Sequence, residues 1–202
     1  MCGRFYVDDD TAKEIQKIVR QMDEKVTFTK RTGDFYPSEN AAVMVAGNKG
    51  SFLTEKRWGF PGFKNSGLII NARAETVLEK RMFGESVRNR RLVIPVSGFY
   101  EWNHEKEKFT FKADDTGGRS SILYLAGFYA HFEGEDRFVI ITTQANPSVK
   151  EVHDRMPLIF REEEVEEWLL NQGSLEKLLH SVPGSLKKKA NDAICHQTSF
   201  LV

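Results

Sequence analysis

The sequence predicts a single α+β domain in which a largely antiparallel, curved β-sheet or barrel is surrounded by helices. Phenylalanine is abundant, at 15 of 202 residues, and segments rich in aromatic and β-branched residues are separated by short turn-forming stretches. These strand-like segments do not alternate regularly with helices, as they would in a parallel α/β fold. Because 202 residues is the size of one domain, we expect residues 1–202 to form one unit.

The strand-forming segments lie mainly in the second half of the chain. Their composition predicts strands at residues 91–96, 108–112, 122–132 and 137–143. Two stretches between them, 114–118 (DDTGG) and 133–136 (EGED), have the composition of hairpin loops.

Four segments carry the apolar spacing of helices. They cover about residues 11–22, 75–83, a stretch that begins near Glu162, and 175–179. Thr11 and Glu14 have the spacing of a capping box, and three glutamates from Glu162 suit the positive end of a helix dipole. The side chains expected to face inward are Ile15, Ile18, Val19 and Met22 in the first helix, Val77, Leu78 and Met82 in the second, and Val165, Trp168 and Leu169 in the third.

Composition narrows the range of functions. Lysine plus arginine equals aspartate plus glutamate at 29 each, which argues against coating of nucleic acid by bulk charge but allows a local basic groove. No apolar run has the length of a membrane span, and the N-terminus lacks an apolar signal core, so we expect a cytoplasmic protein. The run 187–189 (KKK) is interpreted as a solvated face.

Metal and nucleotide sites are not predicted. The two cysteines, Cys2 and Cys195, lie at opposite ends of the chain, and neither they nor the histidines have paired ligand spacing. We find no phosphate-binding loop, dinucleotide fingerprint or serine nucleophile motif. We therefore expect no metal and no cofactor.

Cys2 is the first candidate for chemistry. If Met1 is removed, the chain begins with an amine and a thiol on adjacent carbons, a 1,2-aminothiol that condenses with an aldehyde to a five-membered thiazolidine. Ordinary pKa values of roughly 7.7–8.0 for the amine and about 8.5 for the thiol make both usable nucleophiles near neutrality. The alternative is a buried cysteine with no chemical role.

Three further residues have a context that suits a site. Asn71 and Arg73 follow a short apolar strand, where an amide can both donate and accept and a guanidinium can bind a phosphate; a helix cap is the alternative for Asn71. Glu101 stands between Tyr100 and Trp102, so its carboxyl is expected to be desolvated, with a raised pKa suited to proton transfer, rather than a solvated strand end.

A fifth candidate, His153, lies beside Asp154 and Arg155 and is suited to donate a proton or bind an anion. The other histidines lack such polar neighbours and are interpreted as structural or exposed.

Together these motifs resemble those of the SOS response-associated peptidase (SRAP) family, the abasic-site-processing proteins. The matching segments fall in family order, at residues 1–5 (MCGRF), 57–60 (RWGF), 71–76 (NARAET), 91–102 (RLVIPVSGFYEW), 125–128 (LAGF) and 153–157 (HDRMP). Phe60 departs from the pattern, since many members carry an aliphatic residue there, and Phe63 occupies a variable position.

The resemblance implies an SRAP-like fold and covalent capture of abasic sites in single-stranded DNA as a thiazolidine crosslink, which shields the lesion in the DNA damage response. By the family pattern, Cys2 would be the nucleophile through both amine and thiol after removal of Met1. Asn71 would orient the Cys2 amine and the sugar, Glu101 would move protons, and His153 would assist opening of the sugar ring.

The resemblance also implies a set of DNA-binding residues. Arg4, Arg73 and Arg155 would hold phosphates, and Trp58 with Pro37 or Phe60 would stack against bases next to the lesion. It implies further activities that rank below crosslinking, namely self-directed peptidase removal of Met1 and a slow lyase scission of the strand.

The partner implied is single-stranded DNA that contains abasic sites, bound by a monomer without a membrane or a metal. The location would be cytoplasmic with recruitment to the damaged nucleoid, or nuclear in a eukaryote. Two alternatives remain open: a cysteine peptidase or N-terminal nucleophile amidohydrolase that acts on peptides with Cys2 and His153, and a passive single-stranded DNA-binding module.

Overall fold

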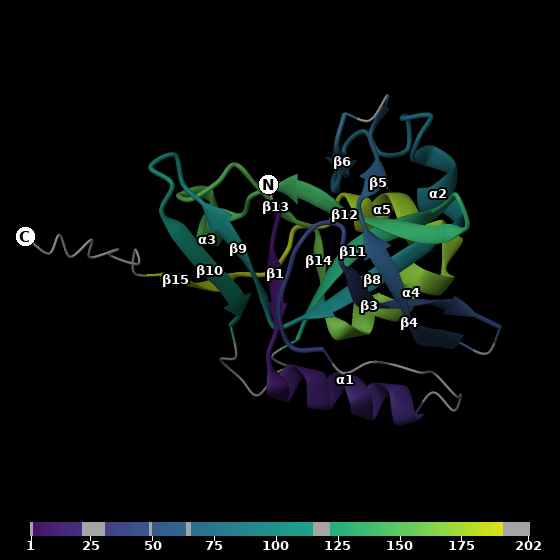
Figure 1. The fold of residues 1–202 in the computed structure, drawn as a ribbon, viewed down its shortest axis with the longest axis horizontal. Coiled ribbons are helices and arrows are strands. Elements are labelled where there is room, and N and C mark those ends of the chain that lie inside the picture. Colours follow the sequence, from purple (N-terminus) through teal and green to yellow (C-terminus); the bar gives the residue numbers. More distant parts are fainter. Residues whose placement is uncertain (1, 22–30, 49, 64–65, 115–121, 192–202) are drawn as a thin grey trace, which may run out of the picture.

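The computed structural model describes residues 2–21, 31–48, 50–63, 66–114 and 122–191 of the chain. Two large β-sheets form the body of the molecule, with helices against their outer surfaces (Figure 1). The larger sheet closes on itself, and the smaller one carries the N-terminal strand.

Five strands of the larger sheet form a closed ring. β12 (Glu135–Gln144) pairs with β4 (Gly50–Trp58), β4 with β3 (Asn40–Gly47), β3 with β8 (Arg91–Val96), and β8 with β11 (Leu123–Phe132). β11 then pairs with β12, which completes the barrel. All of these pairings are antiparallel except that of β12 with β4.

Three short strands extend this sheet near the end of β12. β7 (Asn71–Arg73) pairs with β12 in parallel, and β13 (Arg155–Pro157) pairs with it antiparallel. β14 (Ile159–Phe160) pairs with β11. The end of β12 therefore lies next to two segments that sequence analysis singled out for chemistry.

The smaller sheet has the strand order β15-β10-β9-β1-β2. Its members are β15 (Leu186–Ala190), β10 (Lys108–Ala113), β9 (Gly98–Trp102), β1 (Phe5–Val7) and β2 (Gly33–Phe35). In β9, Phe99 and Glu101 are buried on the inner side, whereas Tyr100 and Trp102 are only half-buried. A third, two-stranded sheet joins β5 (Phe60–Pro61) to β6 (Leu68–Ile69).

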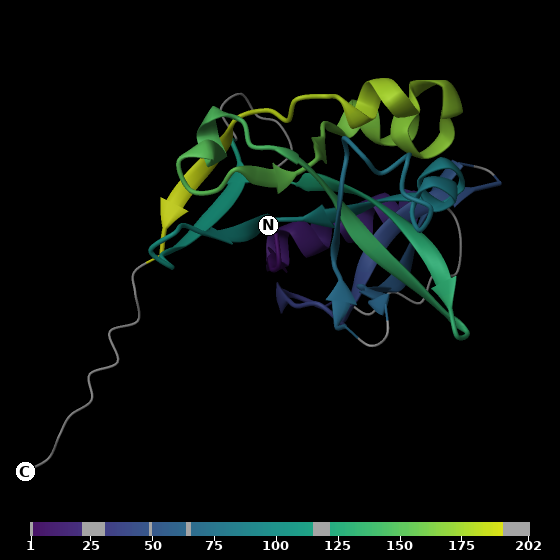
Figure 2. The same ribbon diagram turned by 90° about the horizontal axis from the view of Figure 1, so that it is seen from above.

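Helices cover the barrel on different sides (Figure 2). α1 (Asp9–Gln21) lies along one side of the molecule, while α4 (Glu162–Leu170) and α5 (Leu175–Leu179) lie on another. α4 is fixed to the barrel because the Trp168 indole donates a 3.0 Å hydrogen bond to the carbonyl of Leu92 on β8. The short elements are α2 (Gly84–Asn89), α3 (Pro147–Lys150) and a 3₁₀ turn, Gln172–Ser174.

The core is aromatic. The Trp58 ring lies 5.1 Å from that of Phe5 and 6.3 Å from that of Phe138, so it joins β4, β1 and β12. This burial of apolar surface is the main stabilising contribution to the fold.

Most of the predicted elements are confirmed. The strand at 91–96 is β8, those at 108–112, 122–132 and 137–143 are β10, β11 and β12, and the last two helices are α4 and α5. The 133–136 hairpin turns at Glu133 and Gly134, whose φ angles are 48° and 86°, and strand β12 begins at Glu135. The first helix runs over Asp9–Gln21. Met22 and all of the loop 114–118 except Asp114 lie outside the described residues.

The predicted helix at 75–83 is wrong. This segment is a series of tight turns, closed by hydrogen bonds such as Thr76 N to Arg73 O and Phe83 N to Lys80 O, and a helix begins only at Gly84. The start of this segment is held to β12, since Ala74 N donates a 2.9 Å hydrogen bond to Thr142 O, directly after β7. Met82, expected to face inward, is 46% exposed.

No helix in the described ranges is long and apolar enough to cross a membrane.

Candidate active site

Cys2 lies immediately before β1 and is fully buried. β1 pairs antiparallel with β9, with Phe5 opposite Phe99, and this pairing continues where Tyr100 N donates a 3.0 Å hydrogen bond to Arg4 O. The antiparallel register brings the start of the chain alongside the end of β9, which carries Glu101. Two candidates from opposite halves of the sequence therefore lie close together.

Asn71 holds the backbone of Cys2. Its Nδ2 atom donates a 2.9 Å hydrogen bond to the carbonyl oxygen of Cys2, 69 residues away in the sequence. The Oδ1 atom of the same amide is buried and, among the described residues, has no hydrogen-bond partner. Since buried acceptors are normally satisfied, this oxygen is positioned to accept a proton donor that enters the site. Asn71 begins strand β7, so the helix-cap alternative does not apply.

The position of Asn71 is fixed by its neighbours in β4 and β12. The buried indole of Trp58 donates a 3.0 Å hydrogen bond to the carbonyl of Ile70, and the amide of Ile140 donates to the same carbonyl at 3.1 Å. The carbonyl of Ile70, the residue before Asn71, thus accepts two hydrogen bonds, which restrain the start of β7. The amide side chain is therefore presented from a rigid strand.

Glu101 is 2% exposed. Burial raises the pKa of its carboxyl from the ordinary 4.5 to about 7. A group with that pKa is present in both protonation states near neutrality, which is the requirement for a general acid and base. The sequence-based expectation of a desolvated carboxyl at this position is in accord with this environment.

The Cys2 thiol stays protonated in this environment. Burial raises its pKa well above the ordinary value, and the negative charge of Glu101 raises it further. Its Sγ atom donates only a long contact, 3.8 Å, to the carbonyl of Arg4. The thiol must therefore lose its proton during the reaction rather than before it, and Glu101 is the nearby group whose charge it senses.

His153 lies in the turn between α3 and β13 and is half-buried. Its Nδ1 atom accepts a 2.9 Å hydrogen bond from the backbone amide of Arg155, which places the proton of the neutral ring on Nε2. Burial lowers the pKa of the imidazole. Near neutrality the ring is therefore neutral, with its proton on Nε2.

Arg155 connects His153 to the segment after Asn71. Its two terminal nitrogens donate hydrogen bonds of 2.6 and 2.8 Å to the carboxylate of Glu75, and one of them also reaches the carbonyl of Thr142 at 2.7 Å. The Arg155 charge lowers the pKa of Glu75. Arg155 thus ties β13 to the turns that follow β7, and much of its hydrogen-bonding capacity is used within the protein.

Arg4 and Arg73 are arranged differently. The guanidinium of Arg4 lies over the rings of Tyr36 and Trp102, at 4.5 and 5.2 Å from their centroids. Its Nη1 atom is 3.8 Å from the carboxylate of Asp34, and its side chain is 28% exposed. Arg73 is exposed at the end of β7, two residues after Asn71, and is the most accessible of the three arginines predicted to hold phosphates.

The prediction that Trp58 and Phe60 stack on bases does not fit their burial. Trp58 is 1% exposed and Phe60 0% exposed, and Phe60 packs against the rings of Phe132 and Phe128 at 4.9 and 5.8 Å. Their sequence context did not distinguish a core aromatic from a surface one. Pro37 is half-buried and retains accessible surface.

Sequence reasoning missed the accessible aromatic residues. Tyr36 is 41% exposed, and the half-buried Tyr100 and Trp102 lie on the outer face of β9 beside Arg4. The alternation in GFYEW was the available signal, because a strand that buries Phe99 and Glu101 must turn Tyr100 and Trp102 to the other side. Within the described ranges, no group of three or more histidine, cysteine or acidic side chains is arranged to hold a metal ion.

Known proteins resemble this chain over most of its length. Residues 1–197 match the family described as "SOS response associated peptidase (SRAP)". The chain is 32% identical to the Abasic site processing protein YoaM of Bacillus subtilis, over all of this chain and 92% of YoaM. It is 25% identical to the Abasic site processing protein YedK of Escherichia coli, over 84% of this chain and 79% of YedK.

Solved structures support the fold. A crystal structure of a protein from Bordetella bronchiseptica superimposes with a TM-score of 0.76 at 18% identity, over 95% of this chain and 100% of that one. The family match covers nearly the whole sequence and includes the segments that carry Cys2, Asn71, Glu101 and His153. The chain therefore belongs to the SOS response-associated peptidase (SRAP) family.

Proposed function

We propose that this protein captures abasic sites in single-stranded DNA by forming a covalent thiazolidine through Cys2, after Met1 has been removed. The observation that carries the proposal is the placement of Cys2 between the Asn71 amide, bonded to its carbonyl at 2.9 Å, and the buried carboxyl of Glu101. Relatives named abasic site processing proteins support DNA that contains abasic sites as the substrate.

The first step joins the Cys2 amine to the ring-opened sugar. The amine attacks the aldehyde carbon, a C–N bond forms, and the carbonyl oxygen leaves as water, which gives an imine. This step needs an acid that donates a proton to the departing hydroxyl. Glu101, with a pKa of about 7, supplies that proton, and the unsatisfied Oδ1 atom of Asn71 accepts a hydrogen bond from the amine.

The second step closes the ring. The Cys2 sulfur attacks the imine carbon, a C–S bond forms, and the thiol proton ends on the former imine nitrogen. Because the thiol is protonated in its buried environment, a base must accept its proton as the sulfur attacks. The carboxylate left by the first step is available for this, so one residue serves both steps.

His153 acts earlier, on the closed form of the sugar. An abasic deoxyribose reacts only as the open aldehyde, and ring opening needs a proton on the ring oxygen. The Nε2–H of a neutral His153, fixed by the bond from the Arg155 amide to Nδ1, is the donor we assign to this step. Arg73 and Arg4 hold the phosphates on either side.

A denaturing gel tests the proposal. The purified protein is incubated with a single-stranded oligonucleotide in which a glycosylase has generated one abasic site, and the mixture is boiled in detergent. We expect an adduct whose mass is that of protein plus DNA minus one water. Cys2→Ala and Cys2→Ser keep the amine but lack the thiol, so both should give no adduct that survives boiling, only an imine that borohydride must trap. Equal yields from wild type and Cys2→Ala would end the proposal.

Two further activities follow from the same groups, and we propose them as secondary. Removal of Met1 exposes the reactive amine, and the Cys2 thiol with Glu101 could carry it out on the protein's own chain. Mass spectrometry of Glu101→Gln, made in a cell-free system without methionine aminopeptidase, tests this. Scission of the strand from the imine is the second, and a 3′-labelled oligonucleotide tests for it.

A further inference from the structure

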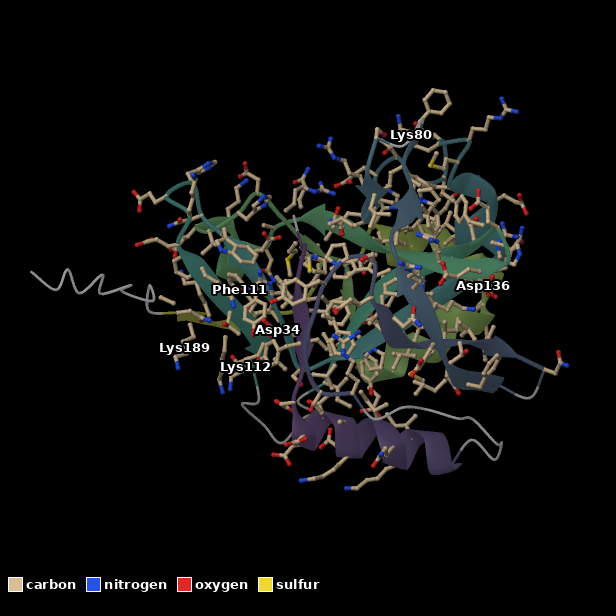
Figure 3. All side chains as sticks on the ribbon, viewed as in Figure 1. Asp34, Lys80, Phe111, Lys112, Asp136 and Lys189 are labelled. Carbon is tan, nitrogen blue, oxygen red and sulfur yellow. The ribbon has the colours of Figure 1, made fainter. Side chains whose placement is uncertain are left out.

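The outer face of the smaller sheet carries a continuous row of basic side chains. On β10, the outward positions are Lys108, Thr110 and Lys112, and on the neighbouring β15 they are Lys187 and Lys189. Phe111 is buried on the other side of β10. Figure 3 shows Lys112 and Lys189 extending from adjacent strands toward the same side of the sheet.

The strand register relates these lysines to the strand that follows Arg4. Lys187 lies opposite Lys112, Lys112 opposite Gly98, and Gly98 opposite Tyr6. One step along the strands, Lys189 lies opposite Thr110, which lies opposite Tyr100, whose amide donates to the carbonyl of Arg4. The lysines therefore lie on the same face as the Arg4 guanidinium, across β9.

Gly98 makes this face continuous. A Cβ atom on Gly98 would lie 2.7 Å from Cε1 and 2.8 Å from the hydroxyl of Tyr6. Only glycine lets the Tyr6 ring lie across β9 toward β10. Beyond it lies a cavity of about 690 Å³, lined by Tyr6, Thr110, Lys112, Lys187, Lys188, Lys189, Ala190 and Asn191.

Among the described residues, three aspartates lie near this face. Asp8 interacts electrostatically with Lys112, and Asp114 lies 3.5 Å from Lys187. Asp34, at the far edge on β2, accepts a 2.9 Å hydrogen bond from Tyr100 and lies near Arg4. Lys188 points to the opposite side, where it pairs with Glu151 at 2.5 Å.

We propose that Lys112, Lys187 and Lys189, called here the lysine face, bind the sugar–phosphate backbone of the DNA strand as it leads away from the captured lesion. The inference rests on the proposed function, since it extends the DNA path that passes Arg4. The positive charge of the lysine face is complementary to phosphate. The lysine face also lies on the same side of the sheet as the guanidinium of Arg4. The cavity beside these lysines is lined by one ring, the half-buried Tyr6, which offers little for base stacking, so contacts to the backbone are favoured over base readout.

The geometry sets the length of strand involved. From β1 to β15 there are three inter-strand steps, or about 14 Å at the usual spacing of β-strands. A strand in B-form DNA rises about 3.4 Å per nucleotide, and an extended single strand covers more. The lysine face should therefore contact phosphates within about four nucleotides of the lesion, on one side of it only.

Binding measurements on DNA that cannot crosslink test the proposal. Fluorescein-labelled oligonucleotides carry a tetrahydrofuran residue, which has no aldehyde, with either one or eight nucleotides on the 5′ or the 3′ side. Anisotropy is measured at several salt concentrations for wild type, for K112A/K187A/K189A and for a control, K13A/K17A/K177A, which removes three exposed lysines from α1 and α5.

Wild type should bind one of the long oligonucleotides more tightly than the short one. K112A/K187A/K189A should lose that gain, with affinity about tenfold weaker and a log–log salt slope shallower by about 2, at ~0.7 per phosphate contact on single strands. The control variant should retain the gain. A K112R/K187R/K189R variant, which keeps the charge, should also retain it.

Two results would overturn the lysine face. One is that K112A/K187A/K189A, verified as folded by circular dichroism, binds the long oligonucleotide as wild type does; the other is that extending the strand on either side adds no affinity. Annealing a complement to the extension shows whether a duplex uses the same face. A separate measurement tests the proposed function: wild-type protein is incubated with a short oligonucleotide that carries a true abasic site. The absence of a covalent adduct there would contradict the proposed function and not the lysine face.

Discussion

The side-chain amide of Asn71 donates a 2.9 Å hydrogen bond to the carbonyl oxygen of Cys2 and so joins β7 to the N-terminal residues. The bond leaves the amine end of Cys2 oriented by a strand of the barrel. The bond therefore connects the segment that leads into β1 of the smaller sheet with β7, which pairs with β12 in the larger sheet.

Loss of the Asn71 amide should slow capture without abolishing DNA binding. We expect Asn71→Ala to lower the single-turnover rate of adduct formation by roughly 10–100-fold, since positioning of the amine is lost. Affinity for a tetrahydrofuran oligonucleotide should change by less than about threefold. An affinity loss as large as the rate loss would assign Asn71 to DNA binding instead.

Replacing the Glu101 carboxyl with an amide should slow both the capture of abasic DNA and its release from the adduct. Glu101→Gln keeps the size of the side chain but cannot transfer a proton, so we expect a loss of about 10²-fold or more in the saturated rate. In wild type the rate should vary with a pKa near 7, and this dependence should vanish in the variant. Rates are measured by quenched gels from pH 5 to 9. A wild-type profile retained in Glu101→Gln would remove Glu101 from the mechanism.

The same carboxyl should lower stability at alkaline pH. Its folded-state pKa of about 7 exceeds the ordinary 4.5, so the folded protein binds the extra proton and loses stability as pH rises from about 4.5 to 7. Above pH 7 the loss is complete, at up to about 3 kcal/mol for a shift of this size. Glu101→Gln should therefore melt higher than wild type at pH 8 and close to it at pH 4.5. Thermal unfolding followed by circular dichroism at both values checks this.

Breaking the Arg155–Glu75 pair should lower the stability of the fold. We expect Glu75→Gln to cost about 1 kcal/mol of stability, a modest value because Glu75 is 38% exposed. Arg155→Lys should also be less stable than wild type, since lysine cannot form the two parallel hydrogen bonds to Glu75. Urea unfolding measures both. A lysine variant as stable as wild type would show that the paired geometry contributes nothing.

The proton of neutral His153 should reside on Nε2. The amide of Arg155 occupies Nδ1, and burial lowers the pKa of the ring. Nitrogen chemical shifts of the imidazole, recorded at pH 7 on labelled protein, distinguish the two tautomers. A protonated Nδ1 at that pH would contradict the role of donor that we assign to Nε2–H.

Local patterns predicted much of the fold because they depend on neighbouring residues. The strand at 91–96 and the helix at 175–179 have the bounds expected from their composition. The helix predicted at 75–83 is wrong because contacts with distant parts of the chain set the backbone there. These contacts are the bond from Ala74 N to Thr142 O and the Arg155–Glu75 pair. Such partners lie some 70 to 80 residues away, and no local pattern contains them.

The candidate site was predictable in part for the same reason. Glu101 was recognised from its aromatic neighbours, whereas the burial of Trp58 and Phe60 depends on how the barrel closes. The outward face of Tyr100 and Trp102 follows from a strand that was not predicted. The register that aligns the lysines of β15 with β10 is likewise a product of pairing between segments about 80 residues apart.

The burial of Cys2 has a consequence for the lifetime of the protein in a cell. Peroxides and alkylating compounds attack the thiolate, and the first oxidation product, a sulfenic acid, leads on to forms that do not revert. A thiol that is fully buried and held protonated offers them neither access nor the reactive form. If Cys2 is used once per lesion, as we propose, this burial keeps the unreacted protein undamaged during oxidative stress.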